Sequence, residues 1–153
     1  MPPSVSPPLP LPRIALILGW GGVIPFVLAA LACLSGNMLW KLQGVIAGSQ
    51  YAAIILSFVG AVHWGIWIDR PAVTHHYQLR WMIWSVTPAL IGFSALMLTP
   101  PIKLYLLMLG FALAWLTDRQ ATRKGYLTEG YMQLRHGLTA TAIASLAIMV
   151  LTI

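Results

Sequence analysis

His63 is the residue of this sequence best placed to do chemistry inside an apolar segment. It lies within residues 43–68, which carry no charged side chain unless the imidazole is protonated. An ionisable group that faces lipid is disfavoured, so if this stretch spans a membrane we expect His63 to be buried between helices or to lie near the interface beside Trp64 and Trp67. A histidine in such a place can be a hydrogen-bonded structural residue, a contact for a proton relay, a quinone or a partner protein, or a ligand of haem or a metal ion.

Ion pairing is the second chemistry that the sequence offers. Only three residues are acidic, namely Asp69, Asp118 and Glu129. Asp118 closes one apolar stretch, Arg135 precedes the next one, and Arg80 opens an earlier one. We expect these ends to meet in an ion-pair cluster at the membrane surface, which more often clamps helices together than catalyses a reaction. With Tyr131 from the same segment, the candidate partner or ligand contacts are His63, Trp64, Trp67, Arg80, Asp118, Tyr131 and Arg135.

Metal and catalytic motifs are missing from the sequence. His75 and His76 are adjacent in a segment that we expect to be a loop, where neighbouring residues form no defined ligand face, so we interpret them as solvated. The sequence contains no glycine-rich phosphate loop, no HExxH motif, no paired acids and no plausible Ser/His/Asp arrangement. We therefore predict no catalytic residue, no metal site and no cofactor.

Membrane helices are the elements that must position these residues. Of the 153 residues, 59% are apolar and 8% are charged, against about 25% charged in an average soluble domain, and the mean hydropathy is +0.81. A soluble fold of this size would need far more polar surface, so the sequence predicts an all-α integral membrane protein.

The net charge of +6 would suggest a nucleic-acid partner in a soluble protein. Here it fits anionic lipid headgroups beside cytoplasmic loops, and we expect no nucleic-acid partner.

Five apolar stretches are predicted to cross the membrane as helices of one bundle, which occupies residues 13–153. A proline-rich tail, residues 1–12, precedes the bundle, and Pro25 is expected to kink the first helix. The 118–136 loop is expected to contain a short interfacial helix. The predicted spans are about 14–35, 43–68, 81–98, 102–117 and 137–153.

The distribution of Lys and Arg predicts the orientation of this bundle. With the amino terminus in the cytoplasm, seven of these residues lie on the cytoplasmic side and two, Lys41 and Lys103, do not. Positive residues gather on the cytoplasmic side of membrane proteins, so we expect N-in, C-out. The seven are Arg13, Arg70, Arg80, Arg119, Arg123, Lys124 and Arg135.

Small residues recur every four positions in the second predicted span. This spacing lets helix backbones approach closely in lipid, where packing and interhelical hydrogen bonds drive association. We therefore expect this span to be the packing centre of the bundle, with an oligomer contact or a close-fitting ligand surface as the alternative. The packing or interaction residues are Ser49, Ala53, Ser57, Ala61 and Gly65.

Short motifs are distributed over most of the chain from Gly19 onward. They are Gly22-Val23-Ile24-Pro25-Phe26, Tyr51 to Gly65 (YAAIILSFVGAVHWG), Ser85-Val86-Thr87-Pro88, Asp118-Arg119, and Leu134-Arg135 with Leu138-Thr139. Together they resemble an uncharacterised family of small bacterial inner-membrane proteins, to which mitochondrial transmembrane protein 69 also looks related. The resemblance implies a five-helix fold in an energy-transducing membrane and supplies no catalytic residue.

Two functional hypotheses follow from these observations. The small-residue span, the proline-rich tail and the missing catalytic motifs favour a non-enzymatic accessory or assembly subunit that packs against a larger respiratory complex. The alternative is a small membrane carrier or a lipid- or quinone-binding protein with His63, Asp118 and Arg135 near its site, which predicts a polar cavity. Under both hypotheses we expect a multi-pass protein of the bacterial inner membrane that contacts anionic lipid headgroups.

Overall fold

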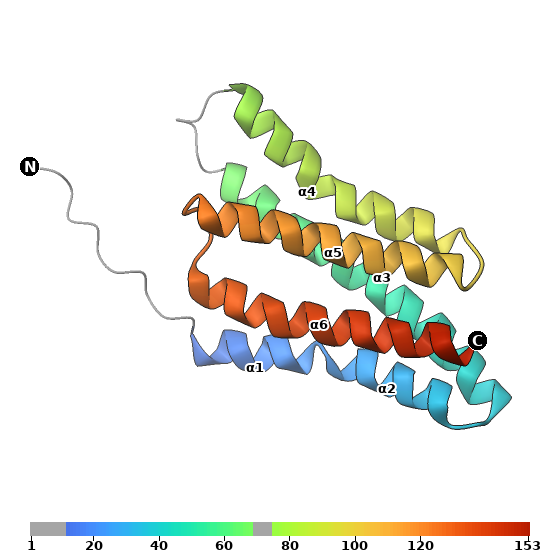
Figure 1. The fold of residues 1–153 in the computed structure, drawn as a ribbon. Helices are drawn as coiled ribbons and strands as arrows, with labels where there is room; N and C mark the ends of the chain where they lie inside the picture. Colours follow the sequence, from blue (N-terminus) through green and yellow to red (C-terminus); the bar gives the residue numbers. More distant parts are fainter. Residues whose placement is uncertain (1–11, 69–74) are drawn as a thin grey trace, which may run out of the picture.

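The protein is an all-α bundle. The computed structural model describes residues 12–68 and 75–153, apart from the side chains of residues 75–78, and contains no strand within those ranges. The helices run back and forth along one axis, so that helix ends gather at two opposite ends of the bundle (Figure 1). They are α1 Arg13–Gly21, α2 Ile24–Leu34, α3 Met38–Ile68, α4 His75–Leu96, α5 Ile102–Arg123 and α6 Glu129–Thr152.

Four helical segments are long and apolar enough to cross a membrane. They are Arg13–Leu34, which joins α1 and α2, then Met38–Ile68, Leu79–Leu96 and Glu129–Thr152. Large apolar side chains such as Ile54, Phe58 and Phe93 are exposed on the outside of the bundle. A water-exposed exterior of this kind is strongly disfavoured, whereas lipid accommodates it. The chain is therefore a multi-pass membrane protein.

The first apolar stretch is two helices rather than one kinked helix. The break falls at Gly22 and Val23, before Pro25, and Pro25 lies in the first turn of α2, where its missing N–H leaves no hydrogen bond unmade. The Tyr51 hydroxyl of α3 donates a hydrogen bond of 2.8 Å to the Gly22 carbonyl oxygen. The sequence placed a kink in this region, and the structure shows that the exposed carbonyl at the break is satisfied from another helix.

The predicted interfacial helix in the 118–136 loop is wrong. Its first part continues α5 as far as Arg123, and its second part forms the opening turns of α6. Only residues 124–128 separate the two helices, with Gly125 in the left-handed region at φ 74°. The Thr128 side chain caps α6 by accepting a hydrogen bond from the Tyr131 backbone N–H at 3.3 Å.

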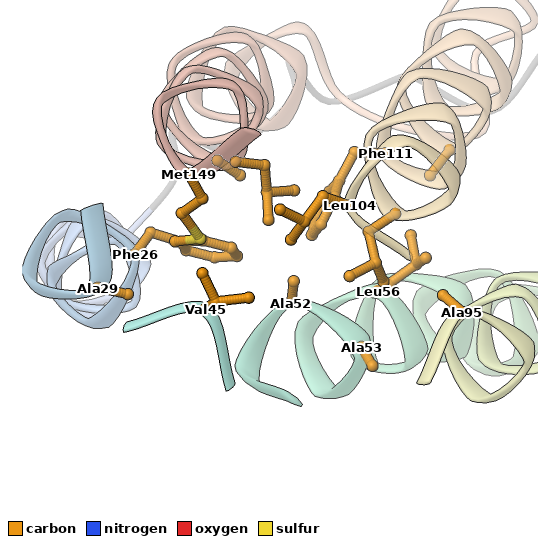
Figure 2. Packing of buried hydrophobic residues seen from close by; sticks show 14 of the residues in the cluster. Phe26, Ala29, Val45, Ala52, Ala53, Leu56, Ala95, Leu104, Phe111 and Met149 are labelled. Carbon is orange, nitrogen blue, oxygen red and sulfur yellow. The ribbon is translucent and has the colours of Figure 1, made fainter. Parts of the chain in front are cut away.

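The core of the bundle is built around α3, which packs against α2, α4, α5 and α6. Leu56 and Ala52 of α3 face Leu104 and Phe111 of α5, and Phe26 of α2 closes the cluster (Figure 2). Glycines allow the closest approaches. A Cβ on Gly44 would lie 2.6 Å from a carbonyl oxygen of α2, and one on Gly48 would lie 2.9 Å from the Cβ of Ala29.

The small-residue stripe of α3 is divided between the inside and the outside of the bundle. Ser49 and Ala53 are buried, Ser57 is half-buried, and Ala61 and Gly65 are exposed. The first members of the stripe therefore pack inside the bundle, and the last two lie on its outer surface. The helix rotates enough over this length for a different row to face inward near its end, and that row contains Val59, His63 and Trp67.

Candidate functional site

The buried carboxylate of Asp118 links three helices by side-chain hydrogen bonds. Asp118 of α5 is fully buried, and its two oxygens have different partners on α3 and α6. His63 Nε2 donates to Asp118 Oδ1 at 2.8 Å, and Arg135 Nε donates to Asp118 Oδ2 at 2.6 Å. Because a carboxylate only accepts, the His63 proton lies on Nε2. We call these three residues the His–Asp–Arg cluster.

The charges of the His–Asp–Arg cluster cancel when the histidine is neutral. Arg135 is 5% exposed and His63 is 1% exposed, so neither side chain is solvated by water. Moving one ion out of water costs several kcal/mol, and a hydrogen-bonded partner of opposite charge offsets that cost. Tyr131 of α6 lies close to the same carboxylate. Two helices, α3 and α6, therefore supply the groups that surround one buried acid of α5.

An aromatic layer lies between this cluster and the nearest helix ends. The His63 ring stacks on Trp81 of α4 with centroids 5.4 Å apart, and Trp81 stacks on Trp67 at 5.7 Å. Tyr126, from the turn before α6, contacts both indoles edge-on. Trp67 follows His63 by about one turn of α3, so the layer extends from the cluster towards the carboxyl end of that helix. It separates the buried charges from the end of the bundle on that side.

Three buried polar atoms of this region have no hydrogen-bond partner among the described residues. They are His63 Nδ1, Arg135 Nη2 and Thr139 Oγ1. Thr139 follows Arg135 by one helical turn, so both lie on the same side of α6. Unsatisfied buried polar groups are uncommon in native structures, and a ligand or ordered water is an ordinary explanation for them.

An apolar cavity of about 400 Å³ reaches the cluster. It lies among α1, α2, α3, α5 and α6, and most of its wall is aliphatic or aromatic. Arg135 and Tyr131 are the polar side chains in that wall. The carrier hypothesis predicted a polar cavity, and the cavity found here is apolar with one polar corner. Representative apolar lining residues are Leu18, Phe26, Val59, Phe111 and Leu138. We call this space the core cavity.

The other predicted contacts are not part of this site. Arg80 is exposed and makes no ion pair with the described residues, so the expectation that it joins Asp118 and Arg135 is wrong. Trp64 is 42% exposed, whereas Trp67 is buried and belongs to the aromatic layer. Asp69 lies outside the described residues, as do residues 1–11 of the proline-rich tail. His75 and His76 fall in the first turn of α4 rather than in a loop, and their side chains are not described.

The chemistry available to the site is hydrogen bonding and charge compensation. No group of three or more His, Cys, Asp or Glu side chains that could hold a metal ion occurs among the described residues. In the sequence, Thr139 stands out only as part of the Leu138-Thr139 motif, and its position four residues after Arg135 indicates that both residues lie on the same side of the helix. The core cavity has no signal in the sequence. The cavity depends on how α1 rests on α6, which no local pattern encodes.

Comparison with known proteins places these features in a family. The profile of the family described as "Protein of unknown function (DUF3429)" matches residues 11–151. Transmembrane protein 69 of Xenopus tropicalis is 33% identical over 141 residues, which is 88% of this chain and 53% of that protein. The chain thus spans about half the length of that relative. No solved structure matches the chain.

Proposed function

The chain belongs to the DUF3429 family, and from that premise we propose that it is a bacterial inner-membrane protein that binds a neutral amphipathic molecule of the lipid or quinone class in the core cavity. The observation that carries this proposal is the meeting of an apolar cavity with a buried arginine. Sites for small molecules are typically apolar spaces with a few polar groups that fix orientation. The apolar wall takes the hydrocarbon part of the ligand, and Arg135 and Tyr131 take its polar end.

The proposed topology has five spans with the amino terminus in the cytoplasm. The span added to the four long apolar segments is α5, the fourth in chain order, whose apolar stretch ends at Thr117, just before Asp118 and Arg119. The bundle supports this orientation, because the start of α1, the start of α4 and the end of α5 lie at one end of it (Figure 1). Those helix ends carry most of the described basic residues, and the cytoplasmic side is where such residues gather.

Charge arithmetic favours a neutral polar end on the ligand. Arg135 is already neutralised by Asp118, so an anionic ligand would add an uncompensated charge beside a carboxylate in a medium of low dielectric constant. A carbonyl or hydroxyl oxygen adds no charge and can accept a hydrogen bond from the guanidinium, whose Nη2 has no partner among the described groups. The ligand class is therefore a long-chain molecule with a neutral acceptor, such as a quinone or an acyl ester.

Binding of a short-chain quinone tests this function. We expect a decyl benzoquinone to bind the detergent-purified protein in isothermal titration, and decanoate, with the same chain length and a negative charge, to bind at least tenfold more weakly. Val62→Phe should fill part of the core cavity and weaken quinone binding about tenfold, because Val62 is a lining residue. Val86→Phe makes the same change at an exposed position of α4 and should leave binding unchanged. Equal binding by the two variants, or tighter binding of decanoate, would contradict the proposal.

A role as an accessory or assembly subunit of a larger respiratory complex is the second candidate. It is favoured by the exposed end of the α3 stripe, where Ala61 and Gly65 offer a partner helix a flat surface in lipid. A partner of fixed stoichiometry should co-purify in mild detergent and be lost on Ala61→Leu. The matched control is Ala47→Leu, at another exposed position of α3. A solitary, monodisperse particle from native membranes would contradict this candidate.

A further inference from the structure

A groove on the outer surface of the bundle follows the contact between α5 and α6. Its volume is about 330 Å³, and no residue lines both this groove and the core cavity. His136 and Ala140 in its wall are exposed, so the groove opens towards lipid rather than into the core. The lining residues are Ala112, Trp115, His136, Thr139, Ala140 and Ile143. We call it the α5–α6 groove.

Thr139 gives the groove a hydroxyl that the described protein groups do not use. Its side chain is 5% exposed, and it is the most deeply buried residue of the wall. Threonine in a helix commonly donates to the backbone carbonyl one turn earlier, as Thr141 does to the Gly137 carbonyl oxygen at 2.9 Å. Thr139 Oγ1 has no hydrogen-bond partner among the described residues. This hydroxyl can therefore bind a group that enters the groove.

His136 supplies a second donor, and its neighbour fixes the position of the proton. The Trp115 indole Nε1–H donates a hydrogen bond of 2.6 Å to His136 Nδ1. Because Nδ1 accepts, the proton of the neutral imidazole lies on Nε2, and Nε2 donates to no described residue. His136 precedes Thr139 by three residues, so two donors lie within about one turn of α6.

A cation lies at one end of the α5–α6 groove. The Arg119 guanidinium lies over the Trp115 ring, 5.4 Å from its centre, and makes no ion pair with the described residues. This cation–π contact holds the positive charge beside the groove wall. Arg119 follows Trp115 by about one turn and lies beyond the apolar stretch that ends at Thr117. Tryptophan prefers the headgroup level of a bilayer, so Arg119 lies at the level of lipid phosphates and the two donors of α6 lie deeper.

We propose that the α5–α6 groove binds a diacyl phospholipid and recognises the carbonyl oxygen of its glycerol ester. Arg119 pairs with the phosphate, and the two donors of α6 bind the ester carbonyl oxygen, whose two lone pairs can accept from both. A glycerophospholipid carries its ester carbonyls just below its phosphate, which is the order in which the groove presents its cation and its donors. The acyl chain lies along Ala112, Ala140 and Ile143. This inference does not depend on the ligand of the core cavity.

Ester-linked and ether-linked lipids separate recognition of the carbonyl from binding of the headgroup. Native mass spectrometry of the intact chain measures the affinity for diacyl phosphatidylglycerol and for its dialkyl ether analogue with the same chain length. We expect the diacyl lipid to bind about tenfold more tightly, because the ether offers no carbonyl and each neutral hydrogen bond contributes about a factor of two to ten. Equal affinity for the two lipids would overturn the proposal.

Thr139→Val removes one donor with little change in shape. It should lower the preference for the diacyl lipid about threefold and change the affinity for the ether lipid by less than twofold. The hydroxyl has no partner among the described residues, so its loss should not unfold the bundle. Thr141→Val is the matched control on the same helix, and it should keep the full preference because Thr141 does not line the groove. The same preference in both variants would overturn the proposal.

Two further variants test the headgroup contact and the position of the site. Arg119→Gln should weaken binding of both lipids about fivefold and keep the preference for the diacyl lipid, since both lipids carry the phosphate and one cation near it contributes about a factor of five. Unchanged affinities in this variant would overturn the placement of the phosphate. Val62→Phe alters only the core cavity and should also keep the preference. Loss of the preference in Val62→Phe would overturn the proposal by assigning ester recognition to the core cavity.

Discussion

The two polar regions of this bundle treat charge in opposite ways. In the His–Asp–Arg cluster the carboxylate of Asp118 is fully buried and both of its oxygens are hydrogen-bonded to neighbouring helices. In the second region, which is the start of α4 around Arg80, the charge is exposed and makes no ion pair with the described residues. A charge without water must find its partner inside the protein, whereas a charge at the interface is solvated by water or by lipid headgroups. The first region therefore fixes helix positions, whereas the charge of the second region is stabilised by its surroundings.

The largest effect should come from removing the acid of the cluster. Asp118→Asn leaves Arg135 charged, buried and without its counter-ion, so we expect a loss of about 3–5 kcal/mol in the free energy of unfolding. Unfolding in mixed detergent micelles with increasing SDS measures it. Glu129→Gln removes the same charge at an exposed position and should stay within about 0.5 kcal/mol of the parent. Equal stability of the two variants would show that the buried pairing contributes nothing.

Replacing both members of the ion pair sharpens the same comparison. In Asp118→Asn/Arg135→Met no buried charge remains, so the double variant should be more stable than Asp118→Asn alone. We expect it to recover about 1–3 kcal/mol, and a thermodynamic cycle with Arg135→Met gives the coupling energy. A double variant as unstable as the sum of the two single variants would mean that the two residues act independently.

A packing change at α3 should have an intermediate effect on both regions. Gly60 lies directly against the Ser85 carbonyl oxygen of α4, so a Cβ at this position has no room. Gly60→Ala must push α4 away, and with it both Trp81, which stacks on His63, and the exposed Arg80 of the same helix. We expect a loss of about 1–3 kcal/mol in the SDS unfolding measurement.

Gly65→Ala is the control for this packing effect. No heavy atom lies within 4 Å of a Cβ built on Gly65, and alanine is the better helix former by up to about 1 kcal/mol. This variant should therefore be as stable as the parent or slightly more stable. If Gly60→Ala were equally well tolerated, the close contact of α3 with α4 would not be what positions the two regions.

The sequence predicted the fold class and the pairing of Asp118 with Arg135, because both depend on local facts. A charged residue at the end of an apolar stretch is visible in the sequence, and so is the scarcity of other charges that could pair with it. Arg80 was assigned to the same cluster wrongly, since the sequence could not show that its helix turns it towards the surface. The interfacial helix failed for a local reason, because Thr128 caps α6 earlier than the apolar pattern indicates.

The core cavity could not be predicted, because it is a property of how helices meet. Its wall combines residues from the two ends of the chain, such as Leu18 and Leu138, and its polar corner exists only because Arg135 turns inward. The division of the α3 stripe between the inside and the outside of the bundle likewise depends on helix geometry. A period of four drifts around a helix with 3.6 residues per turn, so Ser49 and Gly65 face different surroundings.

The smallest effect on stability should come from Arg80, and it separates the two regions most clearly. Arg80→Gln removes an exposed charge that makes no ion pair with the described residues, so unfolding in neutral detergent should change by no more than about 0.5 kcal/mol. If Arg80→Gln instead lowered stability in neutral detergent as much as Asp118→Asn does, Arg80 would be a structural partner inside the bundle and the contrast between the two regions would fail.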